Sequence, residues 1–146
     1  MRAGRVSLGG LAALLLGLLG LAAEGLGEAA LDLLLKADKS TYALGEPIAL
    51  TLEVANRGPR PVTLQFPTAQ RYDIVVHDSQ GREVWRWSAG QMFAQELGEE
   101  ILPPGSVALT YGVTLRERFA PGRYTAVGII PAEGAPIAAS LDLTIR

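Results

Sequence analysis

Hydrophobic and polar residues alternate with a period of two through most of the chain after residue 30. This period is typical of β-strands with one buried face, because successive side chains of a strand point to opposite sides. No helical period follows residue 30, and Gly or Pro stands at nearly every junction between runs. The pattern therefore predicts an all-β fold, an antiparallel β-sandwich of about eight strands within residues 31–146. The expected strands are 31–35, 48–54, 62–66, 72–78, 83–88, 107–115, 124–130 and 137–145.

The middle of the chain predicts a β-hairpin. Two runs of strand-forming residues flank Asp78-Ser79-Gln80-Gly81, which suits a type I turn with Gly81 at positive φ. The expected partners across the hairpin are Asp78 with Arg82, His77 with Glu83, Val75 with Trp85 and Asp73 with Trp87. In this register both tryptophans share one face, and the other face carries Tyr72, Ile74, Val76, Val84 and Arg86. A slip of one residue would exchange the two faces.

The longest stretch without periodicity, residues 89–105, follows the hairpin and contains Met92 and Phe93. Two interpretations of these apolar residues are open: they cap the core beneath the loop, or an extended loop presents them to a partner. The tryptophans have the same two interpretations. An aromatic side chain commonly fills the core of a sandwich, whereas Trp and Arg are enriched at binding hot spots, and Arg86 stands between Trp85 and Trp87.

The N-terminus predicts a signal peptide over residues 1–23. Arg2 and Arg5 precede an unbroken run of Leu, Ala and Gly that ends in small residues at Ala22 and Ala23. This run is shorter than the roughly 20 residues that span a membrane comfortably. We expect cleavage after Ala22 or Ala23 and export to the periplasm or the medium, with no membrane contact afterwards; an uncleaved N-terminal anchor is the alternative. Residues 24–30 are expected to be a flexible lead-in to the sandwich domain.

Charge and composition narrow the possible partners. The chain has 13 basic and 15 acidic residues, and loss of Arg2 and Arg5 with a signal peptide makes the formal charge about −4. A mildly acidic surface argues against a nucleic-acid partner. Because there is no cysteine, the domain is held by its hydrophobic core without disulfides. Removal of the signal peptide leaves enough chain for one domain and too little for two.

Residues that usually carry catalysis or bind metals are sparse. His77 is the single histidine, and Glu96, Glu99 and Glu100 are the closest acidic cluster. We interpret the glutamates as a solvated loop edge, with a weak calcium contact as the alternative. His77 opposite Glu83 is interpreted as a polar pair beside a turn, with catalysis as the alternative. No nucleophile elbow, phosphate loop or dinucleotide motif is present. We therefore expect no enzymatic activity, no metal and no cofactor.

A family resemblance is carried by the same central residues. The run from Gln70-Arg71-Tyr72-Asp73 through the turn to Val84-Trp85-Arg86-Trp87-Ser88 and Met92-Phe93 resembles the BsuPI family, named for an intracellular proteinase inhibitor of Bacillus. A looser similarity extends from about Tyr42 to Gly105. Thr68-Ala69-Gln70 stands where the family usually has Ser-Gly-Gln, which suggests a different local backbone. The resemblance implies an immunoglobulin-like fold and the inhibition of a subtilisin-type serine protease.

Two functions follow from these observations. The first is an exported protein-binding β-sandwich that inhibits a subtilisin-like serine protease through an extended loop. The second is a non-inhibitory immunoglobulin-like module with a structural or assembly role at the cell envelope, and binding of a sugar or another ligand is a third, weaker alternative. The expected partner-binding residues are Trp85, Arg86, Trp87, Ser88, Gln91, Met92 and Phe93.

Overall fold

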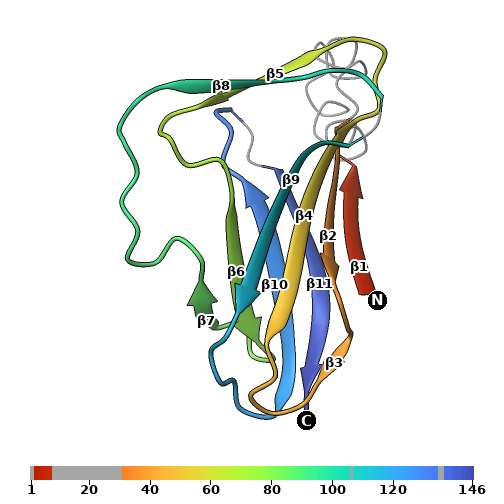
Figure 1. The fold of residues 1–146 in the computed structure, drawn as a ribbon, viewed down its shortest axis with the longest axis vertical. Coiled ribbons are helices and arrows are strands. Elements are labelled where there is room, and N and C mark those ends of the chain that lie inside the picture. The colour runs from red at the N-terminus through yellow and green to blue at the C-terminus, as the bar shows by residue number, and fades with distance from the viewer. Residues whose placement is uncertain (1, 8–30, 106, 135–136) are drawn as a thin grey trace.

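The computed structural model describes residues 2–7, 31–105, 107–134 and 137–146. Throughout these residues the regular structure is β, arranged as two facing sheets with a small ribbon across one end (Figure 1). The strands are β1 (Arg2–Ser7), β2 (Leu31–Ala37), β3 (Thr41–Tyr42), β4 (Ile48–Asn56), β5 (Val62–Phe66), β6 (Asp73–Asp78), β7 (Glu83–Arg86), β8 (Gly98–Leu102), β9 (Val107–Leu115), β10 (Gly122–Ile130) and β11 (Ile137–Ile145).

The strand order gives an immunoglobulin-like β-sandwich, which confirms the predicted fold class. One sheet has the order β1-β2-β4-β9, and the other has the order β3-β11-β10-β6-β7. All neighbouring strands are antiparallel except β3, which runs parallel to β11. Strands β5 and β8 form a separate two-stranded ribbon. The ribbon lies across the upper end of the two sheets in Figure 1.

The core lies between the two sheets and follows the alternation in the sequence. On β4 the residues Ile48, Leu50, Leu52 and Val54 are buried, as are the alternate residues of β11 from Ile137 to Ile145. The sheets approach closely at Gly128 in the middle of β10. A Cβ atom at this position would lie 2.5 Å from Cδ1 of Leu52, so glycine leaves the space that this leucine fills.

Strand β1 begins the chain at the edge of the first sheet. Residues Arg2–Ser7 pair antiparallel with β2, with Gly4 opposite Leu35. Residues 8–23 of the expected signal peptide and the whole expected lead-in, 24–30, lie outside the described residues. Cleavage, export and the alternative of an anchor therefore stay predictions. No helix long and apolar enough to cross a membrane occurs in the part of the chain that the structure describes.

Three strands were not expected from the sequence: β1, whose residues lie within the expected signal peptide, β3 and β8. Strand β3 is a short parallel partner of β11 in a segment with turn residues. Strand β8 lies within residues 89–105, so the interpretation of that whole stretch as irregular is wrong for Gly98–Leu102. The period of two is hidden in β8 because Ile101 faces solvent on the same side as Glu99, while Glu100 and Leu102 face the other side.

The hairpin turn forms as predicted. Gly81 has a φ of 81°, its N–H donates to the Asp78 carbonyl at 3.0 Å, and the Asp78 N–H donates to the Arg82 carbonyl at 2.9 Å. The Asp78 carboxylate also accepts the backbone N–H groups of Gln80 and Arg82. These bonds lower the pKa of Asp78, with the Arg82 N–H as the largest cause. The predicted pairing of His77 with Glu83 is confirmed.

The predicted register is wrong beyond that pair. The pairing shifts between Val76 and His77, so Val76 pairs with Trp85, Val75 pairs with Arg86, and the Trp87 N–H donates to the Ile74 carbonyl. The expected pairs Val75–Trp85 and Asp73–Trp87 do not form, because Val84 is an extra residue that bulges out of β7. The bulge exchanges the faces: Trp85 and Trp87 pack against the core with Ile74 and Val76, and Arg86 lies on the Asp73 side.

Candidate functional site

The predicted site residues lie at the end of β7 and in the loop that follows it. We call residues 88–97, between β7 and β8, the 88–97 loop. Figure 1 shows that it runs outside the two sheets along the left-hand margin of the molecule before it enters β8. The loop begins with a tight turn, in which Gly90 has a φ of 76° and the Gln91 N–H donates to the Ser88 carbonyl at 3.0 Å. The Gln91 amide side chain donates to the Trp87 carbonyl at 2.6 Å.

Met92 projects from this loop into solvent. Its side chain is 98% exposed, the highest value among the large hydrophobic side chains of the described residues, and Leu97 at the end of the loop is 81% exposed. The interpretation that Met92 caps the core is therefore wrong. Phe93 is half-buried and fits both earlier interpretations in part. An isolated, fully exposed thioether on a loop is available for contact with a partner.

A stack of four aromatic rings connects the loop to the opposite sheet. The ring of Phe93 is tilted against Trp87 with centroids 5.9 Å apart. Trp87 stacks on Tyr72 at 4.1 Å, and Tyr72 stacks on Tyr111 of β9 at 4.4 Å. Because β7 and β9 are edge strands of opposite sheets, these rings cover the open side of the sandwich between them. Trp85 also packs against the core, and both tryptophans are only partly buried, so each fits both interpretations in part.

A polar cluster lies on the other side of the hairpin, around Asp73. This carboxylate is only 5% exposed. Its Oδ1 accepts the backbone N–H of Ser88 at 3.1 Å, and its Oδ2 accepts the Ser88 hydroxyl at 2.6 Å and Arg86 Nη1 at 2.9 Å. The Ile74 N–H also donates to Oδ1, at 2.9 Å. Four donors thus satisfy a nearly buried charge, which would otherwise be costly to bury.

Arg86 is committed to the protein rather than free for a partner. Its Nη2 donates to the Glu83 carboxylate at 2.6 Å in addition to the bond with Asp73. These two carboxylates raise the pKa of Arg86, with Glu83 as the larger cause, and Arg86 lowers the pKa of Glu83. Arg71, and not Arg86, lies over an aromatic ring, with Cζ 4.6 Å from the centroid of Phe66. Arg86 is therefore a structural residue at the base of the loop.

The C-terminal end of the loop is held by residues that precede β6. Arg71 donates from Nε to the Glu100 carboxylate at 3.0 Å and from Nη1 to the Thr68 carbonyl at 3.0 Å. The Ala69 N–H donates to the Ala94 carbonyl at 2.9 Å. Arg71, Tyr72 and Asp73 were not among the predicted site residues. The sequence signal that points to them is their place in the motif that carries the family resemblance.

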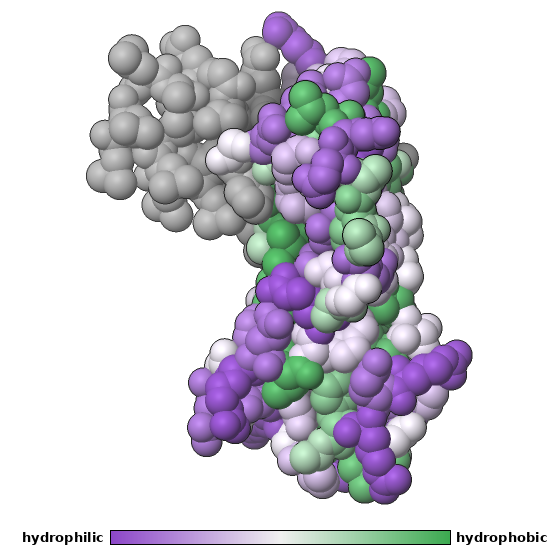
Figure 2. All heavy atoms as spheres, turned by 90° about the vertical axis from the view of Figure 1, so that its left-hand side faces the viewer, coloured by the Kyte–Doolittle hydropathy of each residue, from purple (hydrophilic) through white to green (hydrophobic). Residues whose placement is uncertain are grey.

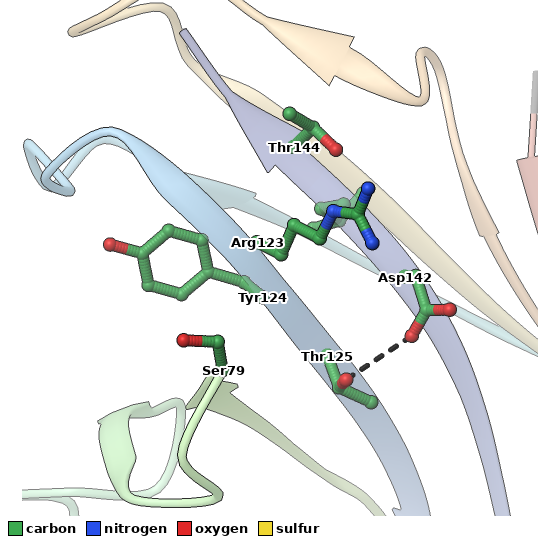
Figure 3. Close-up of a pocket in the computed structure, with 7 residues that line it drawn as sticks. Ser79, Arg123, Tyr124, Thr125, Asp142 and Thr144 are labelled. Atoms are coloured by element: carbon green, nitrogen blue, oxygen red, sulfur yellow. Dashed lines mark hydrogen bonds between the residues drawn. The ribbon is translucent and has the colours of Figure 1, made fainter.

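A second feature is a shallow hollow beside the hairpin turn (Figure 3). It is lined by Ser79 of the turn and by residues of β10 and β11, among which Thr125 Oγ1 donates to Asp142 Oδ1 at 3.2 Å. Tyr124 at its edge donates its hydroxyl to the Ala120 carbonyl at 2.7 Å. This bond forms a tyrosine corner of the kind found in immunoglobulin-like sandwiches. The hollow shares no residue with the loop.

The acidic residues of the described chain form no metal site. No group of three or more His, Cys, Asp or Glu side chains is arranged to hold a metal ion within the described ranges. Glu100 pairs with Arg71, and Glu99 accepts a hydrogen bond from the Gln65 amide at 3.1 Å. These two glutamates thus stabilise the β5–β8 ribbon and its junction with the loop.

Comparisons with known proteins identify a family and agree with the fold. A family model described as "Intracellular proteinase inhibitor", BsuPI, matches residues 35–135. No curated protein sequence matches the chain significantly. Among solved structures, the sporulation control protein Spo0M of Bacillus subtilis has a TM-score of 0.51 at 13% identity, over 78% of this chain and 48% of that protein. At this identity the likeness shows the fold alone.

Two further solved structures have TM-scores below 0.5. The CARDB domain of a Pyrococcus furiosus protein has a TM-score of 0.46 at 13% identity, over 77% of this chain and 84% of that domain. A β-glucosidase from Erythrobacter marinus has a TM-score of 0.43 at 14% identity, and the match covers 77% of this chain. The chain spans only 15% of the length of this enzyme and about half of Spo0M.

Fold and site together define a class of protein: an immunoglobulin-like β-sandwich that presents a loop with an exposed apolar side chain. The chain belongs to the BsuPI family of proteinase inhibitor domains, whose model covers more than half of it.

Proposed function

We propose that this protein inhibits a serine protease of the subtilisin type by inserting the 88–97 loop into the protease active-site cleft. The observation that carries the proposal is the position of Met92, which is 98% exposed on a loop whose two ends are held by the domain. Membership of an inhibitor family makes a protease the natural partner for such a loop. The protein acts as a binding partner and performs no catalysis itself.

The chemistry of Met92 favours the subtilisin type. A subtilisin-like specificity pocket accepts a large hydrophobic side chain before the scissile bond, and the unbranched Met side chain adapts to such a pocket. The bond between Met92 and Phe93 then lies at the protease nucleophile. The flanking backbone is not part of any strand, and it suits pairing with an edge of the protease cleft.

The surface around the loop supports contact through a narrow projection. Figure 2 shows the face that carries the loop, and its hydrophobic atoms form separate patches among hydrophilic ones. A broad apolar interface would require one continuous patch. The partner is therefore engaged by the loop itself more than by the faces of the two sheets.

The proposed site of action is outside the cytoplasm, on the support of the signal-peptide pattern of residues 1–23. Extracellular or periplasmic proteases would then be the targets. N-terminal sequencing of the protein recovered from cells tests this part separately. Recovery of a chain that still begins at residue 1 or 2 in the membrane fraction would favour the anchored alternative.

The inhibitory function is tested by titrating the purified protein against subtilisin with a fluorogenic substrate. We expect inhibition at about micromolar concentration or below, and a loss of affinity of at least about tenfold in Met92→Asp. Leu44→Asp is the matched control, since Leu44 is also an exposed apolar residue but lies far from the loop in the sequence. Met92→Lys should shift inhibition towards trypsin-like proteases, whose pocket binds a basic residue. Unchanged substrate turnover at micromolar wild-type protein would refute the proposal.

A further inference from the structure

We propose that Arg71, Tyr72 and Asp73 act together as positioning residues that hold the 88–97 loop in its binding conformation. We call these three consecutive residues the 71–73 strap. The inference rests on the proposed inhibitory function for its purpose, but the contacts that carry it are independent of any protease. Asp73 contacts the first residue of the loop, Tyr72 contacts Trp87 just before the loop, and Arg71 lies against Gly98 just after it.

Asp73 holds the start of the loop. Its carboxylate accepts both the backbone N–H and the hydroxyl of Ser88, at 3.1 and 2.6 Å. The same carboxylate binds Arg86, the last residue of β7, through Nη1 at 2.9 Å. Because Asp73 is nearly buried and begins β6, which is paired with a strand on each side, it is a fixed point. These bonds fix the direction in which the chain leaves the hairpin.

Tyr72 supports the middle of the loop indirectly, through the ring of Trp87. It lies between Tyr111 and Trp87 in the stack, with centroid distances of 4.4 and 4.1 Å. Trp87 in turn contacts Phe93, the residue after Met92. Offset and tilted aromatic pairs of this kind are favourable. The adjacent hydrogen bond from the Ala69 N–H to the Ala94 carbonyl fixes the backbone just beyond Phe93.

Arg71 holds the end of the loop at Gly98, where β8 begins. Its guanidinium is fixed by the Glu100 carboxylate and the Thr68 carbonyl, and it packs over the ring of the buried Phe66. A Cβ atom on Gly98 would lie 2.3 Å from Nη2 of Arg71. The guanidinium therefore occupies the space that a side chain at residue 98 would take.

The arrangement leaves Met92 as the free part of a loop with fixed ends. An ordered loop does not lose its backbone freedom when a partner binds, so less of the interaction energy is spent on ordering. A loop that keeps its shape also distinguishes an inhibitor from a substrate, because a protease cleaves a mobile loop far more readily than a held one. The strap is thus expected to affect both affinity and resistance to cleavage.

The test uses Asp73→Asn and Gly98→Ala in the full chain. Asp73→Asn keeps the shape of the side chain but puts an NH₂ where an oxygen accepts from Ser88 or Arg86, and Gly98→Ala displaces the guanidinium of Arg71. Gly112→Ala is the matched control, because a Cβ on Gly112 of β9 meets no atom within 4 Å. Three quantities are measured: amide hydrogen exchange of residues 88–97, the rate at which subtilisin cleaves the Met92–Phe93 bond of the folded protein, and inhibition of subtilisin.

We expect both strap variants to speed loop exchange and cleavage by about tenfold or more and to weaken inhibition by a similar factor, with Gly112→Ala unchanged. If cleavage and exchange in both variants stay within about twofold of wild type, the strap proposal is wrong, whatever happens to the melting temperature. If the wild-type protein does not inhibit subtilisin, the proposed function fails. The strap is then judged by exchange and cleavage alone.

Discussion

Gly128→Ala is expected to destabilise the domain by overpacking the centre of the sandwich. The new Cβ would lie 2.5 Å from Cδ1 and 3.3 Å from Cδ2 of Leu52, and 3.4 Å from Cδ1 of Leu35. Carbon atoms in contact lie roughly 3.5–4.0 Å apart, so the closest pair, at 2.5 Å, overlaps by about 1 Å or more. Both leucines are fully buried and face the opposite sheet, which leaves them little room to move.

The magnitude follows from the behaviour of overpacked cores, in which one inserted methyl group costs about 1–3 kcal/mol. For a domain of this size the melting temperature should then fall by about 4–12 °C. The assay is thermal and urea unfolding of Gly128→Ala beside Gly112→Ala, whose Cβ meets open space. Alanine weakens a strand less than glycine, so the control is expected to be neutral or slightly stabilising.

Two further results make the test decisive. Leu52→Val removes the methyl group that overlaps most, so the double variant should lose less stability than the sum of the two single variants. Inhibition of subtilisin at 25 °C should be unchanged in Gly128→Ala, since the atoms nearest the new Cβ belong to Leu52 and Leu35 and not to the strap or the loop. Gly128→Ala is thus a control in which the stability of the domain falls while the conformation of the loop is kept. If Gly128→Ala unfolds at the same temperature as Gly112→Ala, the reasoning from close sheet contact is refuted.

Two tyrosines give the remaining predictions. Tyr124→Phe removes the hydrogen bond to the Ala120 carbonyl and should lower the free energy of unfolding by about 1 kcal/mol in urea denaturation; an unchanged midpoint would mean that the corner contributes nothing. Burial, followed by the hydrogen bond to Asp38, raises the pKa of Tyr42 above its usual value of about 10. The folded state therefore retains the phenolic proton of Tyr42 at a higher pH than the unfolded state does. The resulting stabilisation of the folded state is full below pH ~10 and is lost as the pH rises further towards the folded-state pKa. The free energy of unfolding of wild type and Tyr42→Phe is measured from pH 8 to 11. Equal slopes of this free energy against pH above pH 10 would contradict the prediction.

The sheets could be predicted from sequence because their strands follow simple rules. On β4 and β11 one face is buried between the sheets, so apolar residues recur at every second position. Strand β8 was missed because its exposed face carries Ile101, which removes the alternation. The predicted register of β7 was wrong because the alternation of hydrophobic and polar residues does not reveal that Val84 is an extra residue in the strand.

The candidate site was less predictable, because contacts between distant residues decide which apolar groups are exposed. Nothing in the sequence around Met92 separates a buried loop from a projecting one. The outcome depends on Trp87, which the Val84 bulge turns towards the core, and on Tyr72, which gives Trp87 and then Phe93 a ring to stack on. Once Phe93 packs inward against Trp87, Met92 beside it is left 98% exposed.

The motif residues that carry the family resemblance contact one another in the folded protein. Tyr72 and Asp73 form one part, and Arg86, Trp87, Ser88 and Phe93 form the other. Core packing alone explains Tyr72 and Trp87 but not Asp73, since a buried carboxylate adds no apolar area and needs four donors to be tolerated. Its bonds to Ser88 are made to the first residue of the loop. Under the proposed function, this buried charge fixes where the loop begins, so that the loop keeps the shape that a partner binds.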